Sequence, residues 1–176
     1  MSWRLVVVTA LGACANADHE SPPANDAGYG SLIDHTRWVA LDAEGDPFTA
    51  HRPEAVDCPD WSRQIEGALY EVETGDCNYA SLSQTTLRPI RAGDRVDAVL
   101  WHLWLWAPQV AEAHVAIQIG DWLFFEETVA IPGPEQSYSP SGVAPKDFPL
   151  GTPVVFHLHN HGVNSWRLLS IEVAAP

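Results

Sequence analysis

Alternating side-chain character over residues 151–173 constrains the fold more than any other feature of the sequence. His157, His159 and His161 recur at every second position, so on a β-strand all three point to one face. The positions between them carry Val154, Phe156, Leu158 and Asn160. The first three of these are apolar, so one face of this strand is expected to be core and the other a row of histidines. Gly162 then begins a turn before a second strand.

The rest of the chain has the same character, with short β-type segments between turn residues. The expected strands lie at residues 37–41, 68–73, 84–90, 95–106, 112–119 and 122–131, together with the C-terminal pair. A short helix is expected at 61–66, after Pro59 and an acidic residue that suit a helix N-terminus. Residues 42–53 and 132–149 are expected to be loops. This pattern predicts an all-β fold, a β-sandwich or jelly roll of about eight antiparallel strands with one short helix.

The N-terminus has the features of an export signal. Arg4 supplies positive charge, residues 5–10 form a short apolar run, and the sequence Leu-Gly-Ala-Cys follows at 11–14. This order resembles the signal of bacterial lipoproteins, whose lipobox ends in small residues before a cysteine. The resemblance implies that residues 1–13 are a signal peptide and that Cys14 becomes the lipidated first residue.

An ordinary secretory signal, cleaved near Ala13, Ala15 or Ala17, is the alternative. Under the lipoprotein hypothesis, Ala15 after the cysteine resembles the outer-membrane sorting class, if the host is Gram-negative. Residues 14–31 are small, polar and rich in Pro and Gly, which is typical of a flexible tether. Residues 32–176 are then expected to form one β-sandwich domain. The expected location is the cell envelope, with the lipid bilayer as a partner through the anchor.

Cysteine content and charge narrow the class of protein. Beyond Cys14, the chain contains Cys58 and Cys77, and an even pair in an exported protein predicts one disulfide. A Cys–His zinc site is the competing interpretation, but no histidine lies close to either cysteine in the sequence. The net charge of −14, with only nine Lys and Arg, excludes a protein that binds nucleic-acid phosphates.

A candidate binding face follows from comparing the alternation in different strands. In 95–106 the odd-numbered apolar row is expected to face the core, and the even-numbered row the other side. If 95–106 and 112–119 form a hairpin centred near Val110, their histidine-bearing rows share one face. Residues 122–131 divide in the same way. The candidate ligand-binding residues on this face are His102, Trp104, Trp106, His114, Gln118, Trp122 and Glu126.

Three hypotheses for this face remain open. In the first, tryptophan rings and polar side chains recognise a glycan or another polar ligand. The chain resembles jelly-roll carbohydrate-binding and lectin-like modules at the level of fold. In the second, His157, His159 and His161 bind zinc or copper, with His102 and His114 as further candidates. In the third, the histidines and tryptophans only fill a half-buried face, and the protein is a structural surface lipoprotein without a small-molecule ligand.

The sequence around His157 is similar to copper-site strands of cupredoxin-type domains. It departs from a blue-copper pattern because no cysteine follows at the ligand position and Met1 is the only methionine. No motif of a hydrolase, nucleotide-binding enzyme or metalloprotease is present. Glu126 and Glu127 are adjacent and point apart on a strand, which does not suit paired-carboxylate glycoside chemistry. The sequence therefore predicts an exported, lipid-anchored module that binds a glycan or other polar ligand, with metal binding as the alternative, rather than an enzyme.

Overall fold

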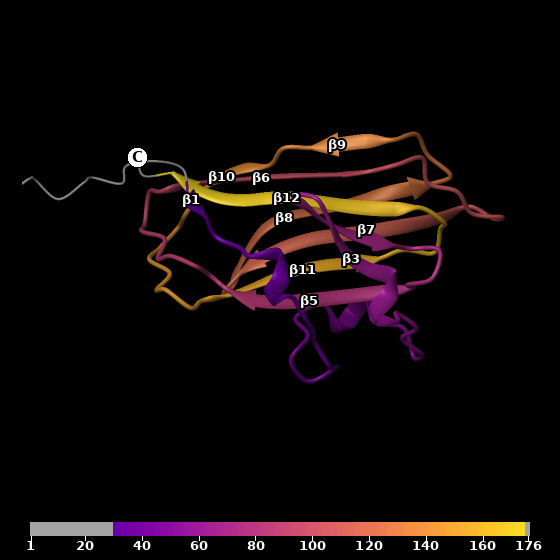
Figure 1. The fold of residues 1–176 in the computed structure, drawn as a ribbon, viewed down its shortest axis with the longest axis horizontal. Coiled ribbons are helices and arrows are strands. Elements are labelled where there is room, and N and C mark those ends of the chain that lie inside the picture. The colour runs from indigo at the N-terminus through magenta and orange to yellow at the C-terminus, as the bar shows by residue number, and fades with distance from the viewer. Residues whose placement is uncertain (1–29, 175–176) are drawn as a thin grey trace, which may run out of the picture.

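Two antiparallel β-sheets packed face to face make up the part of the chain that the computed structural model describes, residues 30–174 (Figure 1). In one sheet the strand order is β10-β6-β12-β4-β3, with β1 also paired to β12 and β9 to β6. In the other sheet the order is β2-β5-β11-β7-β8. The predicted all-β sandwich is therefore confirmed. The expected signal peptide, the lipidation site Cys14 and all but the end of the tether lie outside the described residues.

The strand bounds are as follows. The first sheet contains β1 (Gly30–Ser31), β3 (Arg63–Glu66), β4 (Leu69–Glu73), β6 (Arg95–His102), β9 (Gln136–Tyr138), β10 (Ser141–Val143) and β12 (Ser165–Ala174). The second sheet contains β2 (Val39–Ala40), β5 (Tyr79–Thr85), β7 (Ala111–Ile119), β8 (Trp122–Ile131) and β11 (Pro153–His159). Single 3-10 turns occur at η1 (His35–Arg37), η2 (Thr49–His51) and η3 (Asp60–Ser62). Within residues 30–174, no helix has the length and apolar character needed to cross a membrane.

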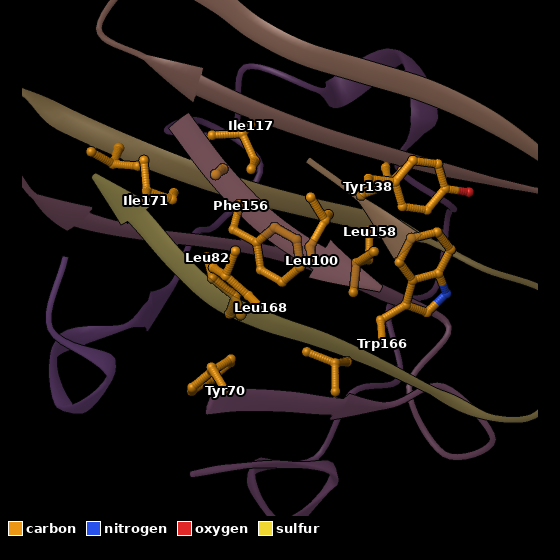
Figure 2. Packing of buried hydrophobic residues seen from close by; sticks show 14 of the residues in the cluster. Tyr70, Leu82, Leu100, Ile117, Tyr138, Phe156, Leu158, Trp166, Leu168 and Ile171 are labelled. Carbon is orange, nitrogen blue, oxygen red and sulfur yellow. The ribbon is translucent and has the colours of Figure 1, made fainter. Parts of the chain in front are cut away.

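Alternate residues of the central strands form the core between the sheets. Phe156 and Leu158 of β11 lie opposite Leu100 of β6 and Trp166 and Leu168 of β12 (Figure 2). All five side chains are buried to within 2 % of full burial. Each such side chain contributes about 1.5–3 kcal/mol to stability when it is removed from water. The core thus fixes which face of each strand is left for other roles.

In β6 the inward row is the reverse of the prediction. Val96, Ala98 and Leu100 face the core together with His102, while Trp101 lies half-buried on the other side. The odd-numbered row begins with the charged Arg95 and Asp97, which stay out of the core, whereas the prediction rested on the apolar residues of that row from Val99 onward. His102 is consequently a core residue of the first sheet.

The expected hairpin between 95–106 and 112–119 is also wrong. β6 ends at His102, and residues 103–110 carry the chain from the first sheet to the second, where β7 begins. Trp106 forms a bridge with Val163 instead of lying opposite His114. β11 and β12 are likewise divided between the two sheets, so the turn between them connects layers.

Other segments differ from the prediction in their bounds or type. The helix expected at 61–66 is the single turn η3 followed by β3, because Gly67 (φ 63°) turns the chain so that β3 pairs with β4. The strand expected at 84–90 shares only its first two residues with β5 (Tyr79–Thr85), and residues 86–90 do not belong to a strand. The expected loop at 132–149 includes β9 and β10, and both pair with β6. The strand expected at 37–41 is the short β2.

The outer face of the second sheet is covered by residues 41–57, drawn in purple beside β5 and β11 in Figure 1. Phe48 packs there against Ala116 and Val155 in a small apolar cluster. Asp46, which is buried, accepts hydrogen bonds from the Tyr79 hydroxyl, from Ser81 Oγ (2.8 Å), from the Phe48 amide (2.9 Å) and from Arg52 Nη1 (2.9 Å). These bonds hold the covering segment in one place on the sheet.

Cys58 and Cys77 form the predicted disulfide, with their Cα atoms 4.0 Å apart. The bond joins the residues before η3 to the residues before β5. It closes a loop of 19 residues, which stabilises the folded chain by about 3 kcal/mol in the chain-entropy treatment. The end of the covering segment is therefore tied covalently to the second sheet.

Candidate metal centre

The outer face of the second sheet brings together histidines from two adjacent strands. β11 pairs with β7 in a register that places His159 directly opposite His114 and His157 opposite Ala116. Since Val115, Phe156 and Leu158 face the core, the three histidines share the outer face. His114 therefore lies on the same face of the sheet as His157 and His159, a question that the sequence leaves open.

A fourth histidine reaches this face from the covering segment. His51, the last residue of η2, stacks on His114 with ring centroids 3.7 Å apart and an interplanar angle of 8°. The His157 ring lies 5.1 Å from His114 and 5.7 Å from His51, and the His159 ring lies 6.5 Å from His51. His161, just after β11, is 4.3 Å from His159. We call these five residues the histidine cluster.

Several ring nitrogens of the histidine cluster are buried and have no hydrogen-bond partner. They are His114 Nδ1, both nitrogens of His157, and His159 Nε2. A neutral imidazole offers one donor and one acceptor, and a buried polar group without a partner costs about 1–3 kcal/mol. His157 is fully buried, with Phe48 stacked on it at 4.5 Å. These buried nitrogens without partners therefore lower the stability of the fold unless another group binds them.

The His114 ring is oriented by a carboxylate on the next strand. Its Nε2 lies 3.1 Å from Oε1 of Glu126 in β8. With the Nε2–H donated to Glu126, the Nδ1 atom of His114 carries the lone pair. A carboxylate behind the ring is the arrangement that commonly orients histidine ligands of metal ions. This contact therefore points the acceptor atom of His114 away from β8 and into the cluster.

Burial keeps the histidines neutral. Desolvation, followed by the neighbouring His114, lowers the pKa of His157 to about 3. Desolvation, followed by His161, lowers the pKa of His159 to about 4. Desolvation and His51 also lower the pKa of His114, although Glu126 opposes this. Near neutral pH these rings are unprotonated, which is the form that binds metal ions.

One group of ligand atoms in the cluster lies close enough to meet a single ion. The candidate atoms of His51, His114 and Glu126 are all within 4.8 Å of one another. Imidazole lone pairs lie in the ring plane, so the parallel rings of His51 and His114 must tilt for both to contact one ion. His51 is only half-buried and sits on a single turn, so it is the ring with room to move.

A pocket of about 530 Å³ opens above the cluster. Its lining consists of His51, Val110, Ala111, Glu112, Ala113, His114, Thr128, His159 and His161. No Lys or Arg is among these lining residues. This volume lies within the range of small-molecule sites.

Four predicted ligand-binding residues lie elsewhere. His102 is in the core between the sheets, where its Nδ1 donates to the Leu103 carbonyl (2.8 Å) and its Nε2 accepts from the Tyr138 hydroxyl (3.2 Å). Trp104 and Trp106 are 57 % and 53 % exposed, beyond the end of β6. The outer face of the second sheet therefore contains the other predicted histidines, but not His102, Trp104 or Trp106.

Trp122 is the fourth residue outside this face. A register shift after Ile117 places it opposite Ile119, on the core side, where it stacks on Phe148 at 6.0 Å. Gln118 does lie on the outer face, but its Nε2 donates to the Gly120 carbonyl (2.8 Å) at the far end of β7. Glu126 is therefore the residue of β8 that contributes to the centre.

Sequence reasoning missed His51 and the residues that position it. His51 lies in a segment with no periodicity, so no spacing rule connects it with His114. Asp46 and Tyr79, which fix the covering segment, are likewise far apart in the sequence. The role of the covering segment follows from its contacts with the surface of the second sheet, which the sequence does not show.

A second pocket, of about 460 Å³, adjoins the first and shares His161 with it. It lies beside the disulfide, and Trp61 at its edge is 67 % exposed. The other lining residues are Asp57, Pro59, Thr74, Gly75, Asp76, Cys77, Asn78, Asn160, Gly162 and Val163. No Lys or Arg occurs among them.

No protein-family model matches this chain, and no curated protein matches it. Among solved structures, one described as "CBM4 structure and function" is 12 % identical, with 80 % of this chain and 88 % of that chain covered and a TM-score of 0.43. A CBM61 structure in complex with β-1,4-galactotriose is 10 % identical, covers 84 % and 88 %, and has a TM-score of 0.39. A cleaved adhesin domain of Lys-gingipain is 14 % identical, covers 86 % and 95 %, and has a TM-score of 0.37. At these TM-scores the similarities carry no argument about function.

Proposed function

We propose that this protein binds a transition-metal ion, zinc or copper, through the histidine cluster. The observation that supports this proposal is the set of buried ring nitrogens without partners on His114, His157 and His159. Bringing several such rings together under a covering segment costs stability unless something satisfies them. A divalent ion offsets part of this cost by accepting lone pairs from the rings that reach it, those of His114 and His159.

The types of side chain favour zinc or copper over the other common ions. Imidazole nitrogen suits zinc and copper, whereas calcium and magnesium prefer oxygen ligands. The thiols of Cys58 and Cys77 are consumed in the disulfide. A blue-copper centre needs a cysteine ligand, so an electron-transfer site of that type is not proposed. His114 is the first ligand we assign, through Nδ1, with Glu126 orienting it from the other side of the ring.

The surrounding charge also supports a cation. The chain carries a net charge of −14, and such a field raises the local concentration of cations. Arg52, which follows His51 in the covering segment, is already paired with Asp46 at 2.9 Å. The pocket above the cluster is lined by Glu112, by four histidines and by side chains without charge.

Metal uptake by purified protein tests the proposal. Protein stripped with a chelator is titrated with zinc and with copper(II), and bound metal is measured by elemental analysis after desalting. We expect stoichiometric uptake by wild type, loss of uptake in a His114→Ala/His159→Ala variant, and a higher melting temperature for the loaded protein. The matched control is His35→Ala, because His35 lies on η1, away from the cluster. No uptake by wild type, or equal uptake by the double variant, would contradict the proposal.

We also propose that the protein is exported and lipid-anchored through Cys14. Support comes from the order of Arg4, the apolar run, the small residues and the cysteine. Mass spectrometry of protein isolated from membranes should find a lipid-modified N-terminal Cys14. An unmodified mature N-terminus at another residue would refute lipidation.

A second candidate function is recognition of a glycan or other polar ligand, and the pocket beside the disulfide favours it. Trp61 offers an exposed aromatic platform there, and Asp57, Asp76 and His161 offer polar atoms around it. Flat rings with nearby hydrogen-bonding groups suit neutral hydroxylated ligands. Trp61→Ala should abolish binding on a glycan array and leave the melting temperature unchanged. Val39→Ala, at an exposed site on β2, is the matched control, and equal glycan binding by Trp61→Ala and wild type would remove this candidate.

A further inference from the structure

We infer that the metal ion in the histidine cluster keeps a coordination position open to the pocket, where it binds an external neutral ligand with a nitrogen or oxygen donor. This inference rests on the proposed metal binding and concerns the use of the same site. Closed zinc sites have four protein ligands and serve stability, whereas sites with a free position act on other molecules. The geometry of the cluster distinguishes the two cases.

The protein ligands reach the ion from the surface of the second sheet and from the covering segment. His114 and His159 rise from the sheet, and His51 comes down from η2 beside them. Among the described residues, one group of three, His51, His114 and Glu126, has its ligand atoms within 4.8 Å of one another, and Glu126 in that group already accepts from His114. His157 lies deeper, under Phe48, with no exposed surface. An ion held by His51, His114 and His159 therefore has three protein ligands, one fewer than a closed site.

The remaining side of the ion faces empty volume. The pocket of about 530 Å³ is much larger than one ion with a bound water, which occupies about 30 Å³. Thr128 on β8 lies directly across from His114, Glu112 lies two residues before His114 on β7, and both line the pocket, with the Thr128 side chain exposed. A ligand bound to the ion would extend along these two strands toward solvent.

The lining sets the chemistry of that ligand. Two carboxylates, Glu112 in the pocket wall and Glu126 behind His114, already balance the charge of a divalent ion. No cation lines the pocket to hold an anion, and Val110, Ala111 and Ala113 form an apolar wall. A neutral donor with a small apolar body fits these conditions better than a free anion does.

Spectroscopy of the loaded protein tests this inference. Wild type carrying cobalt(II) or copper(II) is titrated with imidazole, a neutral donor, and separately with azide, an anion. Bound metal is measured in the same samples. We expect a saturable change in the visible or electron paramagnetic resonance spectrum with imidazole, at a concentration at least tenfold lower than azide requires. Metal content should stay constant during the titration.

A variant at the mouth of the pocket provides the control. Thr128→Phe adds bulk on the exposed side and removes no proposed ligand, so it should retain stoichiometric metal and lose the response to imidazole. Stoichiometric metal in wild type with no spectral response to either probe would overturn the inference and leave the proposed function standing. A stronger response to azide than to imidazole would overturn the assigned ligand class. Failure to take up metal at all would overturn both.

Discussion

Acid should destabilise the metal-free protein through His157 at a pH where carboxylates remain ionised. The ring is fully buried, and desolvation lowers its pKa to about 3. In the unfolded chain the same ring has a pKa of about 6.5. The native protein therefore keeps His157 neutral, whereas the unfolded chain takes up a proton below pH 6.5. Stability from this residue is complete above pH 6.5 and is lost as the pH falls toward 3.

The expected loss follows from proton linkage. Between pH 8 and pH 5.5 the unfolded state gains about 1.4 kcal/mol from protonation of this one ring, because pH 5.5 lies one unit below its unfolded pKa. The native state gains almost nothing, since pH 5.5 is far above its folded pKa. His159 acts in the same direction, but it is half-buried, so solvent weakens its contribution.

Urea denaturation of chelator-treated protein, followed by tryptophan fluorescence, measures this loss at the two pH values. His157→Phe is the matched variant, because it keeps an aromatic ring against Phe48 and cannot titrate. Any overpacking lowers stability at both pH values and cancels in the difference. Wild type should lose about 1.4 kcal/mol more than the variant between pH 8 and pH 5.5. An equal loss in both proteins would refute the argument that His157 is held neutral by burial.

Three further measurements follow from particular contacts. Asp46→Ala should lower the free energy of unfolding by about 3–5 kcal/mol in urea denaturation, because it leaves Arg52 without its carboxylate. Asp34→Ala, which removes a partly exposed carboxylate paired with Arg37, should cost clearly less, and an equal loss in the two variants would contradict the role given to Asp46. Replacing Cys58 and Cys77 by serine should cost about 3 kcal/mol, measured in the same way, and a cost near zero would contradict the stated role of the disulfide. Glu126→Gln should weaken metal affinity about 10–100-fold in calorimetric titration, and unchanged affinity would show that this carboxylate neither orients His114 nor binds the ion.

Alternation predicted the site best where one row of a strand is clearly apolar. In β11 the apolar row of Phe156 and Leu158 could only be core, so the assignment of His157 and His159 to the outer face was secure. In β6 the outward row combines the charged Arg95 and Asp97 with the apolar Val99 and Trp101, and the chain buries the other row, Val96, Ala98, Leu100 and His102. The large apolar residues near the end of the strand therefore gave the wrong row, and the charges at its start indicated the right one.

Long-range placement was the second limit. Residues 103–110 do not distinguish a hairpin turn from a crossing between sheets, because their one turn residue, Pro108, is compatible with both. The difference moves Trp106 from the histidine face to the bridge with Val163. His51 shows the same limit, since its place above His114 depends on the bonds of Asp46 to the sheet. These contacts join segments that no local pattern links.

The pairing of β1 with the end of β12 determines how the protein would sit on a support. Gly30 pairs with Val173, whereas β12 begins at Ser165, at the opposite end of the sandwich and just after His161. In Figure 1 the chain enters beside the C-terminal end, at the end of the molecule away from the start of β12. A surface, carrier or fusion partner attached before Gly30 would therefore leave the mouth of the pocket facing outward. The two-residue strand β1 thus places this attachment point at the end of the sandwich away from the pocket.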